Sequence, residues 1–134
     1  MGSSEDQLGL PEDEVFQAVG HDGFKRLVDA FYRQVPTDDI LGPMYPPDDL
    51  VGAEERLRDF LIFRFGGPTA YLAKRGHPRL RIRHAPFRLN QAARDRWVQL
   101  MERALEDAQL PAESKDLLCA FFHHMATFLM NTPN

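Results

Sequence analysis

Apolar residues recur through most of the chain at spacings of three and four positions, the pattern of an α-helix that buries one face. The clearest example runs from residue 22 to residue 35, with the inward positions Phe24, Leu27, Val28, Phe31 and Tyr32. No segment sustains the two-residue alternation that is typical of a half-buried β-strand. The pattern therefore predicts an all-α fold.

Proline, glycine and capping residues give the expected helix ends. The expected boundaries are Pro11 and Gly20 for a first helix, Asp22 and Val35 for a second, Leu50 and Phe65 for a third, with Asn90 and Pro111 starting the last two. The inward positions of the last three helices are Leu50, Ala53, Leu57, Phe60, Leu61 and Phe65; Ala93, Trp97, Leu100, Met101, Ala104 and Leu105; and Leu117, Leu118, Phe121, Phe122, Met125, Phe128 and Leu129. A proline-rich corner precedes the third helix, and glycine and prolines break residues 68–90 into short pieces.

The composition suits one soluble domain, which we place at residues 10–134 of the 134-residue chain. Residues 1–9 have neither a basic start nor an apolar stretch, so we expect a disordered or tag-derived N-terminus rather than a secretory signal. No apolar run approaches the roughly 18–20 residues that span a membrane. The single cysteine, Cys119, excludes an intramolecular disulfide and agrees with a cytoplasmic location.

Positive charge is concentrated in one part of an acidic chain. Between Ile62 and Arg96 there are nine basic residues and one acidic residue, a balance of +8, whereas the other residues carry seven basic and nineteen acidic groups, a balance of −12. The acidic remainder would repel a polyanion, and no nucleic-acid-binding motif accompanies the basic segment. We therefore expect a small anionic ligand and no nucleic acid partner.

The histidines are the candidate metal ligands. His123 and His124 are adjacent on a helix and point about 100° apart, and no H-E-x-x-H or paired-cysteine motif is present, so we expect no metal site made of protein ligands alone. His84 lies in the stretch "RLRIRHAPF", four positions after Leu80 and beside arginines that can turn toward an anion. The residues alone leave open that His84 is only structural.

A resemblance to a known family decides between these interpretations. The segment "LRDFLIFRFGGPTAYLAKRGHPRLRIRHAPFRLN" followed by "ARDRWVQLM" resembles the group II truncated haemoglobins, and so do "DAFYRQV" and "MYPPDDLVGAEERL". The resemblance covers roughly residues 12–130, with its most specific motif, Gly-His-Pro-x-Leu-x-x-Arg-His-Ala-Pro-Phe, at residues 76–87. It implies a truncated globin fold, a two-over-two helical sandwich around a haem.

The resemblance also implies haem b as the cofactor, with His84 as the iron ligand on the proximal side. The two propionate carboxylates of haem would be partners for Arg83 and Arg81, while Leu80 packs against the proximal face. Further candidates at the haem edge are Tyr71 and Arg64. A solvated face is the alternative role of the outer arginines.

On the distal side the resemblance implies that Tyr32, Tyr45 and Trp97 line the ligand pocket, each with a hydrogen-bond donor. Ala53 matches the position of the distal histidine in many globins but has nothing to donate, and Leu57 lies one turn later above the iron. Donors that stabilise oxygen would slow its release. Without the resemblance, Trp97 and Tyr32 would simply be core residues.

The expected function is that of a haem-binding globin that binds O2, nitric oxide, carbon monoxide or peroxide. Slow O2 release would accompany redox reactivity, either nitric oxide dioxygenation or peroxide chemistry. Enzymatic turnover would need a separate reductase, because the chain has no flavin or nicotinamide fingerprint. The alternatives are a gas or redox sensor and a haem-free helical interaction module. The sequence leaves the oligomeric state open, with a homodimer as one possible assembly by analogy.

Overall fold

The computed structural model describes residues 12–68 and 88–132, and within these ranges every regular element is helical. The elements in chain order are η2 (Glu12–Glu14), α1 (Val15–Gln34), η3 (Gly42–Met44), η4 (Pro47–Asp49), α2 (Leu50–Arg64), α5 (Gln91–Ala108) and α6 (Ala112–Leu129). The all-α prediction is confirmed. No helix in the described ranges is long and apolar enough to cross a membrane.

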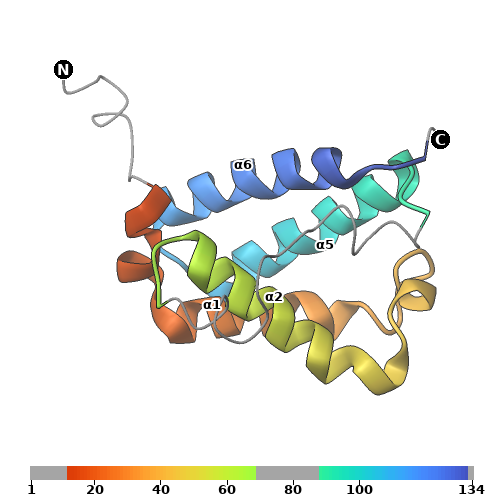
Figure 1. Ribbon diagram of the computed structural model, residues 1–134, viewed down its shortest axis with the longest axis horizontal. Helices are drawn as coiled ribbons and strands as arrows, with labels where there is room; N and C mark the ends of the chain where they lie inside the picture. The colour runs from red at the N-terminus through yellow and green to blue at the C-terminus, as the bar shows by residue number, and fades with distance from the viewer. Residues whose placement is uncertain (1–11, 69–87, 133–134) are drawn as a thin grey trace.

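The helices form two packed pairs. The helix α1 packs against both α2 and α5, and α5 packs against α6, so α1 and α2 make one layer and α5 and α6 the other (Figure 1). Aromatic side chains join the layers, since Phe65 at the end of α2 meets Phe121 of α6 with ring centroids 4.9 Å apart. This is the two-over-two sandwich that the sequence predicted.

Gly20 interrupts the first helical stretch where the sequence predicted a helix end, and the chain resumes helical geometry immediately after it. Gly20 has φ 76° and ψ 168°, a conformation outside the helical region, yet α1 runs from Val15 to Gln34 with a kink at this residue. Glycine lacks a Cβ and therefore tolerates a positive φ at one position. The sequence predicted two helical segments that meet at Gly20, and this break is confirmed as a kink within α1.

A tight turn fixes the end of α2 against the start of α1. Gly66 has φ 93°, and a Cβ at this position would lie 1.8 Å from the backbone oxygen of Asp13. The adjoining Phe65 carbonyl accepts a hydrogen bond of 2.9 Å from the Phe16 amide. The predicted glycine end of this helix is confirmed, and its physical reason is the close approach of the η2 backbone.

The corner between α1 and α2 is attached to α5 by one nearly buried carboxylate. Asp38 accepts hydrogen bonds from the backbone amides of Ile40 and Leu41 at 3.1 and 2.8 Å. The Asp38 carboxylate is also 2.7 Å from the guanidinium of Arg96 on α5. This arrangement fixes the chain that leads to Tyr45 relative to the helix that carries Trp97.

Helix α5 begins as the sequence predicted, because the Asn90 side chain accepts a hydrogen bond of 2.9 Å from the Ala93 amide. Helix α6 follows Pro111. The expected inward position of Phe128 is wrong, since this residue is 44% exposed. At 100° per residue Phe128 lies about 60° from Met125 at the centre of the apolar stripe, and it falls in the last helical turn.

Candidate functional site

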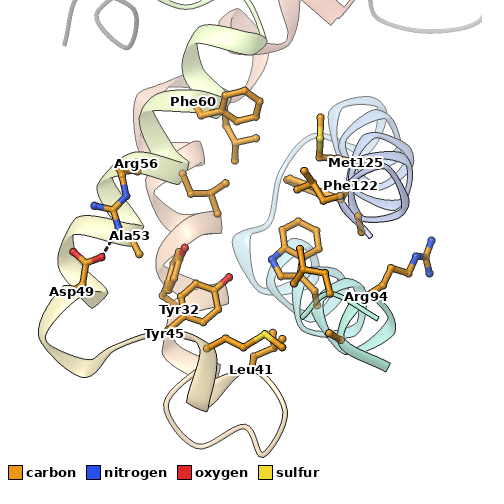
Figure 2. Close-up of a pocket in the computed structure, with 18 of the residues that line it drawn as sticks. Tyr32, Leu41, Tyr45, Asp49, Ala53, Arg56, Phe60, Arg94, Phe122 and Met125 are labelled. Carbon is orange, nitrogen blue, oxygen red and sulfur yellow. Dashed lines mark hydrogen bonds and ion pairs between the residues drawn. The ribbon is translucent and has the colours of Figure 1, made fainter. Parts of the chain in front are cut away.

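A cavity of about 310 Å³ lies between α2 on one side and α5 and α6 on the other (Figure 2). Its lining is mostly apolar. The lining residues from the helices are Tyr32 from α1; Ala53, Arg56, Leu57, Phe60 and Leu61 from α2; Ala93, Arg94 and Trp97 from α5; and Phe121, Phe122, Met125, Ala126 and Leu129 from α6. The remainder, Leu41, Met44, Tyr45, Pro46, Asp49 and Leu89, come from the connecting segments.

Three polar aromatic side chains converge at one end of this cavity. The rings of Tyr32 and Tyr45 meet edge to face with centroids 5.6 Å apart, although they come from α1 and from the corner before α2. The polar groups of Trp97 and Tyr32 both lie close enough to the Tyr45 hydroxyl to lower its pKa. Figure 2 shows both tyrosine hydroxyls directed into the cavity. The structure therefore brings together the three predicted donors.

Burial keeps both tyrosine hydroxyls protonated. Burial raises the pKa of Tyr32 far above its ordinary value, and the negative charge that Tyr45 would acquire on ionisation raises it further. Burial also raises the pKa of Tyr45, an effect that the hydrogen bonds with Trp97 and Tyr32 only partly offset. Both groups are consequently available as O–H donors at neutral pH.

Neighbouring rings hold the indole in place. Phe31 packs on Trp97 with ring centroids 5.5 Å apart, and Phe122 of α6 contacts the other side with centroids 5.6 Å apart. Phe31 also meets Tyr32 edge to face at 5.0 Å. Because these rings leave the indole little freedom to turn, its N–H is preorganised toward the cavity end.

The α2 wall contains no hydrogen-bond donor at its two predicted positions. Ala53 and Leu57 both line the cavity, one helical turn apart. Their side chains supply a methyl group and an isobutyl group, so neither position can donate a hydrogen bond to a ligand in the cavity. Phe60 and Leu61 continue the apolar wall toward the end of α2.

Three charged residues at the cavity margin were not predicted. Arg56 on α2 pairs with Asp49 at 2.5 Å, beside Ala53 (Figure 2). Arg94 on α5 reaches across to α6, where it donates to the Thr127 hydroxyl at 3.1 Å and to the His123 carbonyl at 3.4 Å. Helical spacing was the available signal, because Arg56 and Arg94 each lie three positions from a predicted site residue, Ala53 and Trp97 respectively.

Arg64, a predicted candidate for the haem edge, lies away from the cavity. Its guanidinium pairs with Glu12 at 2.8 Å and stacks over the rings of Phe65 and Phe121 at 5.3 and 5.2 Å. The remaining predicted residues fall outside the described ranges: His84, Leu80, Arg81, Arg83 and Tyr71. Their roles stay predictions.

A two-over-two helical sandwich with an apolar cavity, closed at one end by polar aromatic donors, defines a globin. A family model described as bacterial-like globin matches residues 14–131, and the chain belongs to this family. Within it, the chain belongs to the group II truncated haemoglobins. It is 32% identical over 124 residues to the group 2 truncated hemoglobin YjbI of Bacillus subtilis, covering 92% of this chain and 93% of that protein.

Solved structures agree with the sequence relatives. A thermostable hemoglobin from the actinobacterium Thermobifida fusca is 45% identical with a TM-score of 0.85, over 90% of this chain and 98% of that one. The group II truncated hemoglobin of Bacillus anthracis is 32% identical with a TM-score of 0.85, over 93% and 95% of the two chains. The likeness extends over nearly the full length of each protein.

Proposed function

We propose that this globin binds haem in the cavity between α2, α5 and α6 and holds O2 there with slow release. The observation that carries the proposal is the convergence of Tyr32, Tyr45 and Trp97 on one end of an otherwise apolar cavity. Haem iron, when bound, would supply the coordination position for a diatomic ligand. The names of the relatives, all hemoglobins, support the same cofactor.

The residues present fit a flat, mainly apolar cofactor. The volume of about 310 Å³ falls within the range of roughly 300–1,000 Å³ that is usual for small-molecule sites. Two apolar walls face each other, Leu57 and Phe60 on α2 and Met125 and Leu129 on α6. A hydrophobic disc between such walls is removed from water on both faces, which favours its binding.

The proximal part of the proposal rests on the sequence motif. We assign His84 as the iron ligand, Leu80 to the proximal face, and Arg83, Arg81 and Tyr71 to the propionate edge. Chain order supports this assignment, because Leu89, five positions after His84, lines the cavity. Of the described arginines, Arg56 and Arg94 line the cavity, whereas Arg64 is paired with Glu12.

The distal residues act on the ligand by hydrogen bonding. The indole N–H of Trp97 can only donate, and the hydroxyls of Tyr32 and Tyr45 at the same end of the cavity can also donate. A ligand that carries partial negative charge gains most from such donors, so O2 is favoured over carbon monoxide, which is nearly neutral. Ala53 itself supplies no donor, and on the same helix Arg56 is paired with Asp49, so we assign ligand retention to the aromatic groups.

Redox reactivity toward nitric oxide or peroxide would use the same donors, which stabilise negative charge that develops on a small ligand. The chain supplies no electron-carrying cofactor motif of its own, so turnover needs an external reductase. A gas or redox sensor would use the same cavity and differ only in its partner.

The O2 dissociation rate of the reduced protein tests the proposal. Replacing Trp97 by Phe or Tyr45 by Phe removes one donor each, and a charge-assisted hydrogen bond of about 1.5–3 kcal/mol corresponds to a rate increase of roughly ten- to a hundredfold. Tyr32→Phe should also accelerate release, because the Tyr32 hydroxyl is a further donor beside Tyr45 at this end of the cavity. Stopped-flow replacement of O2 by carbon monoxide gives the rates.

Phe128→Leu is the matched control, since Phe128 lies on α6 but is exposed and outside the cavity lining. Its rate should stay within about threefold of the parent protein, less than the loss of one hydrogen bond would produce. The double variant, Trp97→Phe with Tyr45→Phe, should increase the O2 dissociation rate by less than the product of the two single increases. The reason is that the two neighbouring groups act on the same ligand. Unchanged release in all three single variants would refute hydrogen-bonded retention of O2.

A further inference from the structure

Outside the cavity, three side chains with metal-ligating atoms meet on the outer side of α5 and α6. Glu102 from α5 and Cys119 and His123 from α6 place one ligand atom each within 4.8 Å of one another. The Nε2 atom of His123 lies 2.7 Å from a Glu102 carboxylate oxygen, and the Cys119 sulfur lies 3.8 Å from the same oxygen. Among the described residues this is the one such group of His, Cys and acidic side chains.

Helical geometry explains why the three residues meet. Cys119 and His123 are four positions apart and therefore lie one above the other on the same face of α6. The neighbouring helix α5 packs along α6 and supplies Glu102 to that face. The sequence did not reveal the cluster because its third member is seventeen positions away from Cys119, on another helix. His124 points to a different face of α6 and is not a member.

The separations are close to those of a tetrahedral zinc site. Bond lengths of about 2.3 Å to sulfur and 2.0–2.1 Å to nitrogen or oxygen place tetrahedral ligand atoms roughly 3.3–3.6 Å apart. The observed 2.7 Å between His123 and Glu102 would need to open by about 0.6 Å, and the 3.8 Å between Cys119 and Glu102 to close by about 0.3 Å. The side chains of His123 and Glu102 are 42% and 49% exposed, so rotamer adjustments of this size are available.

The charged groups around the Cys119 thiol are mostly carboxylates. Burial raises the pKa of Cys119, and the Glu102 and Asp116 carboxylates raise it further, whereas Lys115 lowers it. Lys115 is itself paired with Glu106, which offsets its charge. A divalent cation would reverse this balance, because it stabilises the thiolate and the carboxylate together.

One neighbouring group competes with the cation. The guanidinium of Arg94 lies 3.5 Å from Nδ1 of His123, a contact in which Nδ1 accepts and Nε2 carries the proton that faces Glu102. Metal ligation through Nε2 would move that proton to Nδ1 and weaken the contact. Arg94 would still be held through Thr127 and the His123 carbonyl, at 3.1 and 3.4 Å.

We propose that Glu102, Cys119 and His123 form a binding site for one zinc ion, separate from the haem cavity. The mixed sulfur, nitrogen and oxygen ligands suit zinc, which accepts all three in tetrahedral sites. With three protein ligands, the fourth position is open to water. Such an ion joins α5 to α6 and thereby stabilises that layer of the fold.

The test uses the full-length, haem-loaded protein. Zinc is titrated against a competing chelating indicator, and we expect one ion bound per chain. Cys119→Ser and His123→Gln should each weaken binding at least tenfold, whereas His124→Gln, the adjacent histidine outside the cluster, should leave it within twofold. X-ray absorption at the zinc edge detects only this metal and should show one sulfur at about 2.3 Å.

Circular dichroism checks that each variant is folded. Glu102→Gln tests the third ligand of the cluster with a side chain of unchanged size. Zinc affinity that is equal in the parent protein and in both the Cys119 and His123 variants would overturn the proposal. So would bound zinc with no sulfur ligand, or binding lost in His124→Gln alone. Absence of saturable zinc binding to the folded parent protein would overturn it as well.

Discussion

A single carboxylate can join a local turn to a helix that lies far away in the sequence. Asp38 is an example, because its carboxylate accepts from the Leu41 and Ile40 amides and from Arg96, and its side chain is only 8% exposed. Asp39, the next residue, contacts the same guanidinium at 2.7 Å but is 83% exposed. The two carboxylates therefore provide a matched pair with different burial.

Replacing Asp38 by Asn should lower the free energy of unfolding at pH 7 by about 1–2 kcal/mol, because charged hydrogen bonds in a nearly buried position are lost. Burial alone would raise the pKa of Asp38, but the hydrogen bonds from Leu41, Arg96 and Ile40 lower it below its ordinary value of 3.8. A lowered pKa stabilises the folded state above pH 3.8, and this stabilisation is lost as the pH falls through the folded-state value.

Urea unfolding between pH 7 and pH 3 measures this effect. The difference between the parent protein and Asp38→Asn should be largest at neutral pH and shrink below about pH 4. Asp39→Asn should have a smaller effect throughout, since exposed ion pairs contribute little. Equal effects of the two substitutions, or a difference that does not depend on pH, would show that the Asp38 carboxylate does not hold the corner.

At this scale the sequence predicted the donors but not their partners. Tyr32, Tyr45 and Trp97 follow from the resemblance, and the structure places them together. The reach of Arg94 to Thr127 depends on which helices pack together, whereas Arg56 and Asp49 are seven positions apart at the start of one helix, α2. Side-chain partners across helices are not encoded in local spacing, and therefore only the fold reveals them.

At the scale of elements, helix ends were predictable where a local interaction sets them. Asn90 caps α5 through its own side chain, which requires only the three following residues. Gly20 has a positive φ, as a helix-ending glycine does, and a second helical segment that buries Phe24 and Leu27 begins directly after it. The predicted break is therefore present as a kink within α1.

Alanine substitutions at Gly20 and Gly66, which both have a positive φ, distinguish the cost of backbone strain from the cost of a steric clash. Gly66→Ala should lower the free energy of unfolding by more than about 3 kcal/mol, because the new methyl group would collide with the Asp13 carbonyl oxygen as well as strain the backbone. Gly20→Ala should cost only about 1–2 kcal/mol, the price of the left-handed conformation, since nothing lies within 4 Å of its added Cβ.

Denaturant unfolding of the two variants gives both values under the same conditions. The account requires the larger loss at Gly66, where α2 ends against η2. Similar losses at the two glycines would mean that the contact with Asp13 relaxes easily and does not fix the turn.

At the scale of the whole molecule, two layers of helices leave an apolar cavity whose polar groups gather at one end. The two-over-two arrangement was predictable because the helical pattern and the quoted motifs extend over most of the chain. The zinc-ligating cluster was not, because it depends on the register of α5 against α6. The sequence wrongly predicted that Phe128 is buried. An apolar stripe along a helix does not show at which turn the helix stops packing against its neighbours.

The central claim is that the cavity holds a haem whose iron is ligated by His84. An optical spectrum of the purified protein, as isolated, reduced, and reduced with carbon monoxide, tests it most directly when His84→Gly and the exposed control His124→Gly are recorded alongside. The account predicts an intense Soret band that shifts with redox state and with carbon monoxide, is weakened or displaced in His84→Gly, and is unchanged in His124→Gly. A folded protein without a Soret band after haem is added, or a His84→Gly spectrum identical to that of the parent protein, would contradict it.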